Sequence, residues 1–305
     1  MSRGALALAL WLAVAPGSAQ IKIPVWVEAP EGSLRTDVPG KQFEAFVDDK
    51  RVRIRSVQGP ADNLVLLIVL DLAGDLARVE ALRSALAEAV PKLGPREVVG
   101  LLEAQDGLTV LQDPTSDRDA IVRNVENAAV GGKAGLLDTV ETAADLAGGI
   151  LRKAAVRVAL LYLTDSRIGN YRTDYVNPVI NASDRSDLSR RFPDRLIQER
   201  TTQLASALES CQAPIFILHL ESRTGPLDEA YQNGLKKMAE VTGGEAVFCR
   251  TPAEIAGALE QMLQRIRSGY TLVFDAPAKP RRLVRIRISA GGGQRLIFRN
   301  RLAMK

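Results

Sequence analysis

Two aspartates stand directly after apolar runs and are the residues of this chain best placed to do chemistry. Residues 64–70 are wholly apolar and end at Asp71, and the largely apolar residues 156–164 end at Asp165. A parallel strand that is covered on both faces has such a continuous apolar sequence, and ligands gather where the carboxyl ends of these strands meet. Two carboxylates at that edge could share one cation, because Mg²⁺ and Ca²⁺ bind oxygen ligands.

Strands and helices alternate around these two runs. Helical spacing of apolar residues predicts helices over residues 76–93, 117–128, 135–152, 195–209, 227–242 and 252–268. Strands are predicted at 64–71, 97–104, 108–112, 156–164, 215–220 and 245–248. This order predicts an α/β fold over residues 63–268, with a Rossmann-like, doubly wound and mainly parallel sheet.

Both ends of the chain have the two-residue period of β-structure. Strands are predicted at 23–27, 43–47 and 51–55, and again at 270–274, 283–289 and 295–298. Neither set has enough strands to be stable alone. We therefore expect residues 20–62 and 269–305 to pair as one small β-sandwich, with the α/β domain inserted into it.

Residues 1–19 have the composition of a secretory signal peptide. Arg3 precedes an apolar stretch from Ala5 to Ala15, and small residues lie before the expected cleavage after Ala19. The stretch is shorter than the roughly 20 residues that a membrane span needs. The sequence therefore predicts a secreted or periplasmic protein with no membrane span in the mature chain.

The composition argues against several classes of function. The chain has 305 residues with a net charge of +4, from 40 basic and 36 acidic residues, which is too balanced for a nucleic-acid-binding protein. The single histidine, His219, lies in the apolar run 215–220 and is interpreted as a structural residue. Because the sequence has no second histidine, phosphate loop, dinucleotide motif or Cys-x-x-Cys motif, we predict no enzymatic activity.

Export would place the two cysteines in an oxidising compartment, where disulfides form. Cys211 precedes the strand predicted at 215–220, whereas Cys249 follows the strand predicted at 245–248. If these strands are parallel neighbours, the two sulfur atoms lie at opposite ends of the sheet. We therefore expect two buried thiols and no bridge between them.

The order of these parts resembles the VWFA-related proteins abundant in Acidobacteria, which contain a von Willebrand factor type A domain. The resemblance extends over nearly the whole mature chain. Residues 25–27 and 43–50 match the leading β segment, 64–71 and 160–165 match the two central strands, and 269–272 and 285–288 match the closing strands. It implies a sheet rim that binds a protein partner through a metal-ion-dependent adhesion site.

The adhesion site of that family uses an Asp-x-Ser-x-Ser motif, a later threonine and a second aspartate. Asp71 and Asp165 match the two aspartates, but Ala73 and Asp75 stand at the serine positions and Ala134 at the threonine position. Alanine side chains cannot coordinate a cation. The resemblance therefore implies a degenerate site.

Two interpretations of this degenerate site stay open. The carboxylates of Asp71, Asp75 and Asp165 could hold Mg²⁺ or Ca²⁺ with water filling the remaining positions. Alternatively, no metal binds, and either Lys133 or a backbone amide at the start of the following helix offsets the negative charge.

A long polar stretch, residues 166–194, begins at the same rim. Its tyrosine and asparagine content suits surface recognition, and disorder is equally compatible with its length. The candidate partner-binding residues of the rim are Ala73, Lys133, Ala134, Ser166, Tyr171 and Tyr175.

Basic residues alternate with apolar ones in both terminal β segments. Arg51, Arg53 and Arg55 are spaced two apart, as are Arg285 and Arg287, which is expected to place each set on one face of a strand. Both sets of arginines are interpreted as the solvated face of the sandwich, or as a basic platform for an acidic polysaccharide or a membrane surface.

Together these features predict an exported, non-enzymatic protein-interaction module of the adhesion type, with an unidentified extracytoplasmic protein partner. The alternative is a structural or assembly component of the cell envelope, in which the sandwich makes the contacts and the metal site is dead.

Overall fold

The structure is a computed structural model, and it describes residues 20–171, 193–277, 281–292 and 294–304. The predicted signal peptide and Tyr175 lie outside the described residues. None of the helices in the described part of the chain is long and apolar enough to cross a membrane.

A six-stranded sheet forms the centre of the α/β domain, with the strand order β11-β10-β9-β6-β7-β8. The strands are β6 (Leu64–Asp71), β7 (Glu97–Glu103), β8 (Thr109–Thr115), β9 (Arg157–Thr164), β10 (Ile215–His219) and β11 (Ala246–Phe248). All neighbours pair in parallel except β8, which is antiparallel to β7. Every residue of β6 and β9 is buried, as their continuous apolar sequences predicted.

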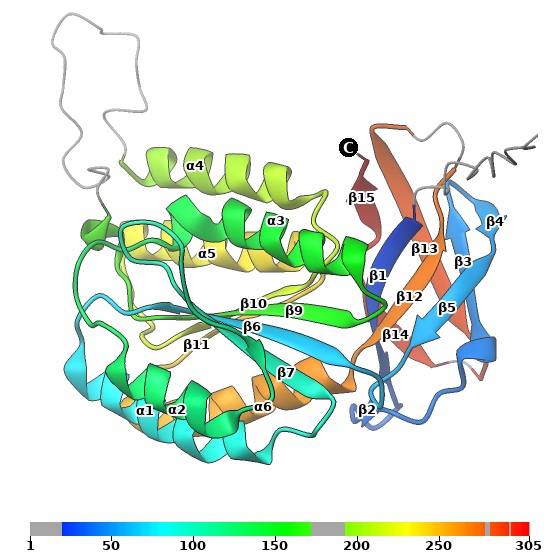
Figure 1. Ribbon diagram of the computed structural model, residues 1–305. Helices are drawn as coiled ribbons and strands as arrows, with labels where there is room; N and C mark the ends of the chain where they lie inside the picture. Colours follow the sequence, from blue (N-terminus) through cyan, green and yellow to red (C-terminus); the bar gives the residue numbers. More distant parts are fainter. Residues whose placement is uncertain (1–19, 172–192, 278–280, 293, 305) are drawn as a thin grey trace, which may run out of the picture.

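Helices cover both faces of this sheet (Figure 1). One layer contains α3 (Leu136–Lys153), α4 (Pro193–Leu208) and α5 (Pro226–Thr242), and the other contains α1 (Leu76–Ala89), α2 (Arg118–Asn127) and α6 (Ile255–Ser268). The short 3-10 helices Val90–Lys92 and Pro252–Glu254 complete the predicted helices 76–93 and 252–268. The prediction of an α/β fold with a mainly parallel, doubly wound sheet is confirmed.

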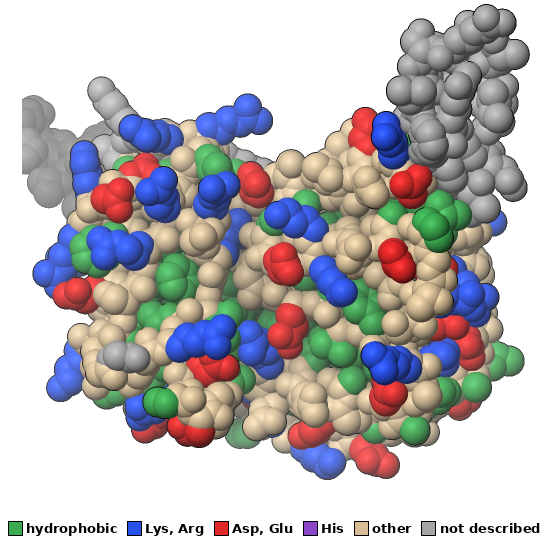
Figure 2. Space-filling view, turned by 180° about the vertical axis from the view of Figure 1, so that it is seen from behind, with side chains coloured by type: hydrophobic (Ala, Val, Ile, Leu, Met, Phe, Trp, Pro, Cys, Tyr) green, Lys and Arg blue, Asp and Glu red, His purple; other side chains and the backbone are tan. Residues whose placement is uncertain are grey.

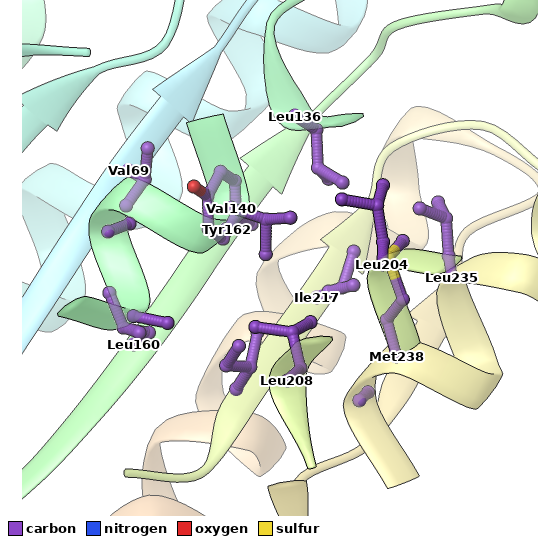
Figure 3. Close-up of a cluster of buried hydrophobic side chains, with 14 of the residues drawn as sticks. Val69, Leu136, Val140, Leu160, Tyr162, Leu204, Leu208, Ile217, Leu235 and Met238 are labelled. Atoms are coloured by element: carbon purple, nitrogen blue, oxygen red, sulfur yellow. The ribbon is translucent and has the colours of Figure 1, made fainter. Parts of the chain in front are cut away.

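The core beneath α3, α4 and α5 is made of hydrophobic side chains from the sheet and from all three helices, including Tyr162 and Met238 (Figure 3). Helices α4 and α5 approach each other closely at Gly234, where a Cβ atom would lie 2.4 Å from a side-chain carbon of Thr201. Only glycine allows this contact, so the α4–α5 packing depends on the residue type at position 234.

Strands from the two ends of the chain pair into two antiparallel sheets. The first has the order β14-β1-β12-β5 with β2 beside β1, and the second has the order β15-β13-β3-β4. Their bounds are β1 (Gln20–Glu28), β2 (Leu34–Arg35), β3 (Phe43–Val47), β4 (Lys50–Val52), β5 (Ile54–Gln58), β12 (Tyr270–Asp275), β13 (Leu283–Ala290), β14 (Arg295–Phe298) and β15 (Arg301–Ala303). Ile23 pairs with Leu272 and Val47 with Ile286, and these side chains share one buried cluster between the sheets.

The arginines of residues 51–55 do not lie on one strand, contrary to the prediction from the sequence. The predicted single strand is divided at Arg53, so that Arg51 belongs to β4 in one sheet and Arg55 to β5 in the other. Arg55 forms an ion pair with Asp275 at 2.8 Å on β12. The chain changes sheets at this corner, and therefore these arginines do not share one face.

Buried polar contacts tie the sandwich to the amino edge of the central sheet. Arg157, at the start of β9, donates hydrogen bonds to backbone carbonyls at residues 60 and 62, before β6, and at residues 266, 267 and 269, at the end of α6 and directly after it. Burial lowers the pKa of its guanidinium. On the facing side, the indole N–H of Trp26 in β1 donates to the carbonyl of Arg265 at 2.7 Å. The two chain segments that link the sandwich to the α/β domain are therefore both anchored at the edge of the central sheet opposite Asp71.

Candidate functional site

The carboxylate of Asp71 lies at the carboxyl end of β6 and is completely buried. Its Oδ1 accepts a hydrogen bond from the backbone N–H of Gly135 at 2.8 Å, and its Oδ2 accepts one from the hydroxyl of Thr164 at 2.9 Å. Burial raises the pKa of Asp71 to about 6, against the opposing effect of these hydrogen bonds. Each carboxylate oxygen of Asp71 thus accepts a hydrogen bond from within the protein.

Asp165, after β9, is directed at the loop that follows β6. Its Oδ1 accepts from the N–H of Ala73 at 2.5 Å, and its Oδ2 accepts from the N–H groups of Gly74 at 3.1 Å and Asp75 at 2.7 Å. These amides lead into the first turn of α1, where a negative charge is stabilised by the helix dipole. Asp165 thus holds the 73–75 loop in place.

Asp75 is turned away from the other two aspartates because it caps α1. Its Oδ1 accepts from the N–H of Arg78 at 3.3 Å, and its Oδ2 pairs with the Arg78 guanidinium at 3.2 Å. That guanidinium also donates to the carbonyls of Leu220 and Arg250. An aspartate at this position is a helix cap, and its arginine partner joins the loops after β6, β10 and β11.

The two alanines and the lysine of the predicted site also have clear positions. Ala73 is partly exposed, and its N–H is the one that Asp165 binds. Ala134 is buried, and its N–H donates to the carbonyl of Asn170 at 2.9 Å. Lys133 is exposed and forms no ion pair with a described residue. Of the two groups that were expected to offset the negative charge, the backbone amide at the start of α3 is the one that hydrogen-bonds Asp71.

These residues do not fit the divalent cation that the resemblance implies. The carboxylate oxygens of Asp71 and Asp165 accept backbone and hydroxyl hydrogen bonds, Asp75 faces Arg78, and the two alanines offer no side-chain oxygen. Across the described ranges, no group of three or more His, Cys, Asp or Glu side chains is placed to hold a metal ion. An oxygen-rich shell of the kind that Mg²⁺ and Ca²⁺ require is not formed.

Two further rim candidates, Ser166 and Tyr171, are buried, so the expectation that they form a docking surface needs correction. The Ser166 hydroxyl donates to the carbonyl of Asp71 at 3.3 Å, and the Tyr171 hydroxyl lies 2.7 Å from that of Tyr231 on α5. Both side chains were predicted to be accessible because they follow the end of β9. The chain instead turns back over the sheet through the 3-10 helix Ile168–Asn170.

His219 belongs to the same buried layer and has a structural role. Its Nε2 lies 2.9 Å from the carbonyl of Ser166, and its Nδ1 accepts from the N–H of Glu221 at 3.1 Å. These contacts fix a neutral tautomer with the proton on Nε2, in agreement with the pKa of this histidine being lowered by burial.

The accessible part of the rim surrounds this buried layer. Leu76, the first residue of α1, is 65% exposed, and Lys133 before α3 and Arg167 after β9 are exposed as well. Arg167 and Arg223 both pair with one Oε2 of Glu221, at 3.1 and 2.7 Å. Neither Leu76 nor the cluster at Glu221 is among the residues predicted from the sequence. Leu76 could have been found from the sequence, because it is an apolar residue directly after the helix cap Asp75. No sequence pattern indicates that Arg167 pairs with Glu221.

The two cysteines occupy opposite ends of parallel strands, as expected. Strands β10 and β11 pair in parallel, Cys211 precedes the first and Cys249 follows the second, and both side chains are buried. The Cys211 thiol donates to the carbonyl of Ala213 at 3.3 Å, and burial raises the pKa of the Cys249 thiol to about 11. The two thiols are not joined to each other.

No protein-family model and no curated protein matches this sequence. Among solved structures, the vWF domain of the type V pili tip protein Mfa5 from Porphyromonas gingivalis is similar at 14% identity and a TM-score of 0.46, over 67% of this chain and 95% of that chain. A von Willebrand factor type A structure from Catenulispora acidiphila is similar at 12% identity and a TM-score of 0.46, over 95% of this chain and 75% of that chain.

A third similar structure is proximal thread matrix protein 1 from the mussel byssus, solved with a zinc-occupied MIDAS motif. It shares 11% identity and a TM-score of 0.45, over 72% of this chain and 49% of that chain. At such identities and TM-scores, function has to be argued from the residues of this chain.

Proposed function

We propose that this chain is an exported, non-enzymatic protein-interaction module with a von Willebrand factor A-like α/β domain whose rim works without a metal ion. The observation that carries the proposal is the engagement of Asp165 by the three N–H groups of residues 73–75. In a metal-dependent rim, a cation orders the loops around the aspartates. Here the same loops are ordered by hydrogen bonds to the carboxylates, so the rim is preorganised for binding by the chain alone.

The partner-binding surface is composed of the exposed residues around the sealed aspartates, Leu76, Lys133, Arg167 and Arg223. Leu76 supplies an apolar contact, and the three charged residues supply polar ones, a combination typical of protein interfaces. The Leu76 side chain is 65% exposed. Exposure of an apolar side chain to water does not stabilise the folded protein. A partner that covers it would gain the free energy of removing this apolar surface from water.

Capture experiments with the mature protein test this function. Immobilised parent protein is incubated with an envelope fraction in Mg²⁺ or in EDTA, together with Leu76→Ser/Lys133→Glu and the control Leu146→Ser/Lys153→Glu. The control replaces an exposed leucine and an exposed lysine on α3. We expect one specific partner that is retained in EDTA and by the control, and lost with the rim variant. A partner that EDTA releases would contradict a metal-free rim.

A structural or assembly component of the envelope is the second candidate function. Arg157 favours it, because its contacts to both connecting segments join the sandwich and the α/β domain firmly. In that case the α/β domain is a spacer and the contacts are made elsewhere. Capture that the rim variant retains in full would support this candidate over the first.

A further inference from the structure

Four arginines extend across the outer face of the β15-β13-β3-β4 sheet, and we call this cluster the arginine face. It consists of Arg285 and Arg287 on β13, Arg301 on β15 and Arg51 on β4. Arg285 is the direct cross-strand partner of Arg301, and Phe46 on β3 is the partner of both Arg287 and Arg51. In β13 the arginines alternate with the buried Val284, Ile286 and Ile288, so their side chains point to solvent.

The pairing of Arg285 with Arg301 is unfavourable for folding. Like charges directly opposite each other on neighbouring strands lower the stability of a sheet. The acids nearby compensate only in part: Glu44 pairs with Arg51 at 2.6 Å, and Asp49 lies 4.0 Å from Arg285. Arg287 lies over the ring of Phe46 at 3.9 Å, and neither it nor Arg301 forms an ion pair with a described residue. The face therefore keeps a surplus of positive charge that folding does not require.

The surrounding surface has the same character. Lys and Arg side chains gather on the sandwich lobe, at the left of the view in Figure 2. Leu283, the residue two positions before Arg285 on the same face of β13, is 39% exposed. Arginine thus lies beside exposed aliphatic surface on a regular sheet face.

We propose that the arginine face binds the surface of an anionic lipid bilayer. Guanidinium groups bind phosphate oxygens in bidentate geometry, and basic residues near an anionic leaflet each add to the affinity. An open sheet face presents its side chains together to a surface, and the exposed Leu283 can enter the headgroup region beside them. No membrane-spanning helix is needed for this peripheral mode of binding.

The position of the face in the fold supports this use. Trp26 of the other sheet packs in the core cluster of the α/β domain, so β13, β3 and β4 lie on the far side of the sandwich, whereas the edge strand β15 contacts the end of α4 through the N–H of Ala303. The parallel strands of the central sheet begin beside the sandwich and end at the opposite edge (Figure 1), where Asp71 is the last residue of β6. A protein bound through the arginine face would therefore hold its rim away from the membrane, where a partner could reach it.

Vesicle sedimentation measures this binding directly. The mature parent protein is mixed with vesicles of phosphatidylcholine alone or with about one third phosphatidylglycerol, at low and high salt. We expect binding only to the anionic vesicles, with loss at high salt. Arg285→Glu/Arg301→Glu should weaken it tenfold or more, whereas the control Arg123→Glu/Lys153→Glu, which makes the same change in net charge on α2 and α3, should bind like the parent. Equal binding by the two variants, or none by the parent, would overturn the proposal.

A second variant separates lost binding from lost folding. Arg285→Gln/Arg301→Gln removes the like-charge pair, so its urea midpoint should equal or exceed that of the parent while vesicle binding falls. A soluble polyanion, dextran sulfate, is included as an alternative ligand. Binding of dextran sulfate without binding of anionic vesicles would assign the face to a soluble polyanion and reject the lipid surface.

Discussion

The carboxylate of Asp165 lies 2.7 Å from the backbone nitrogen of Asp75, and the two acids therefore belong to one hydrogen-bonded chain rather than to one ligand shell. Asp165 accepts from the N–H of Asp75, and Asp75 in turn caps α1 through the N–H of Arg78. The loop after β6 is thus held by Asp165 and by the cap of α1.

Replacing Asp165 with asparagine should destabilise the protein strongly. Asparagine keeps one acceptor oxygen, but its NH₂ group would face the donors of Gly74 and Asp75. We expect a loss of about 3 kcal/mol in the free energy of unfolding, because charge-assisted hydrogen bonds to buried groups are lost. Urea denaturation measures it, with the exposed Asp113→Asn as control. A loss that appears only with Mg²⁺ present would indicate a metal site instead.

The protonation of Asp71 should make stability depend on pH between 4 and 6. Its folded-state pKa of about 6 exceeds the unfolded value of about 3.9, so the folded protein holds this proton more tightly. The resulting stabilisation is fully present below about pH 4 and is lost as the pH rises through 6, by about 3 kcal/mol in total. Denaturation at pH 4 and 7 should show that Asp71→Asn lacks this component. An unchanged difference between the two pH values in the variant would disprove the assignment.

Gly135 should not tolerate even alanine. A Cβ atom at this position would lie 1.2 Å from the carbonyl oxygen of Ala104, and the N–H of the same residue binds Asp71. Gly135→Ala must therefore move the start of α3 away from β7, and we expect a loss of about 3 kcal/mol or more. Gly257 on α6 has open space at the Cβ position, so Gly257→Ala should stabilise by about 0.5–1 kcal/mol. Comparable effects of the two changes on the urea midpoint would contradict this description of the rim.

The sequence alone determined the fold class and the placement of the two central aspartates. The apolar runs before Asp71 and Asp165 identify buried parallel strands because only strands covered on both faces are apolar throughout. The spacing of apolar residues identified the helices for a similar reason, since residues three and four apart share one side of a helix. The position of both cysteines followed from the direction of the strands, without any knowledge of the side-chain contacts.

Only the tertiary structure decided what the carboxylates do. The sequence shows that Ala73 and Ala134 lack coordinating oxygens, but it does not show that backbone amides of residues 73–75 and 135 bind the two carboxylates. Those contacts join residues more than 60 positions apart, and they depend on loop conformations that no local pattern encodes. The sequence also does not predict that Arg285 and Arg301 lie directly opposite each other on neighbouring strands. Their pairing depends on the strand register, which is set only when β13 and β15 pair.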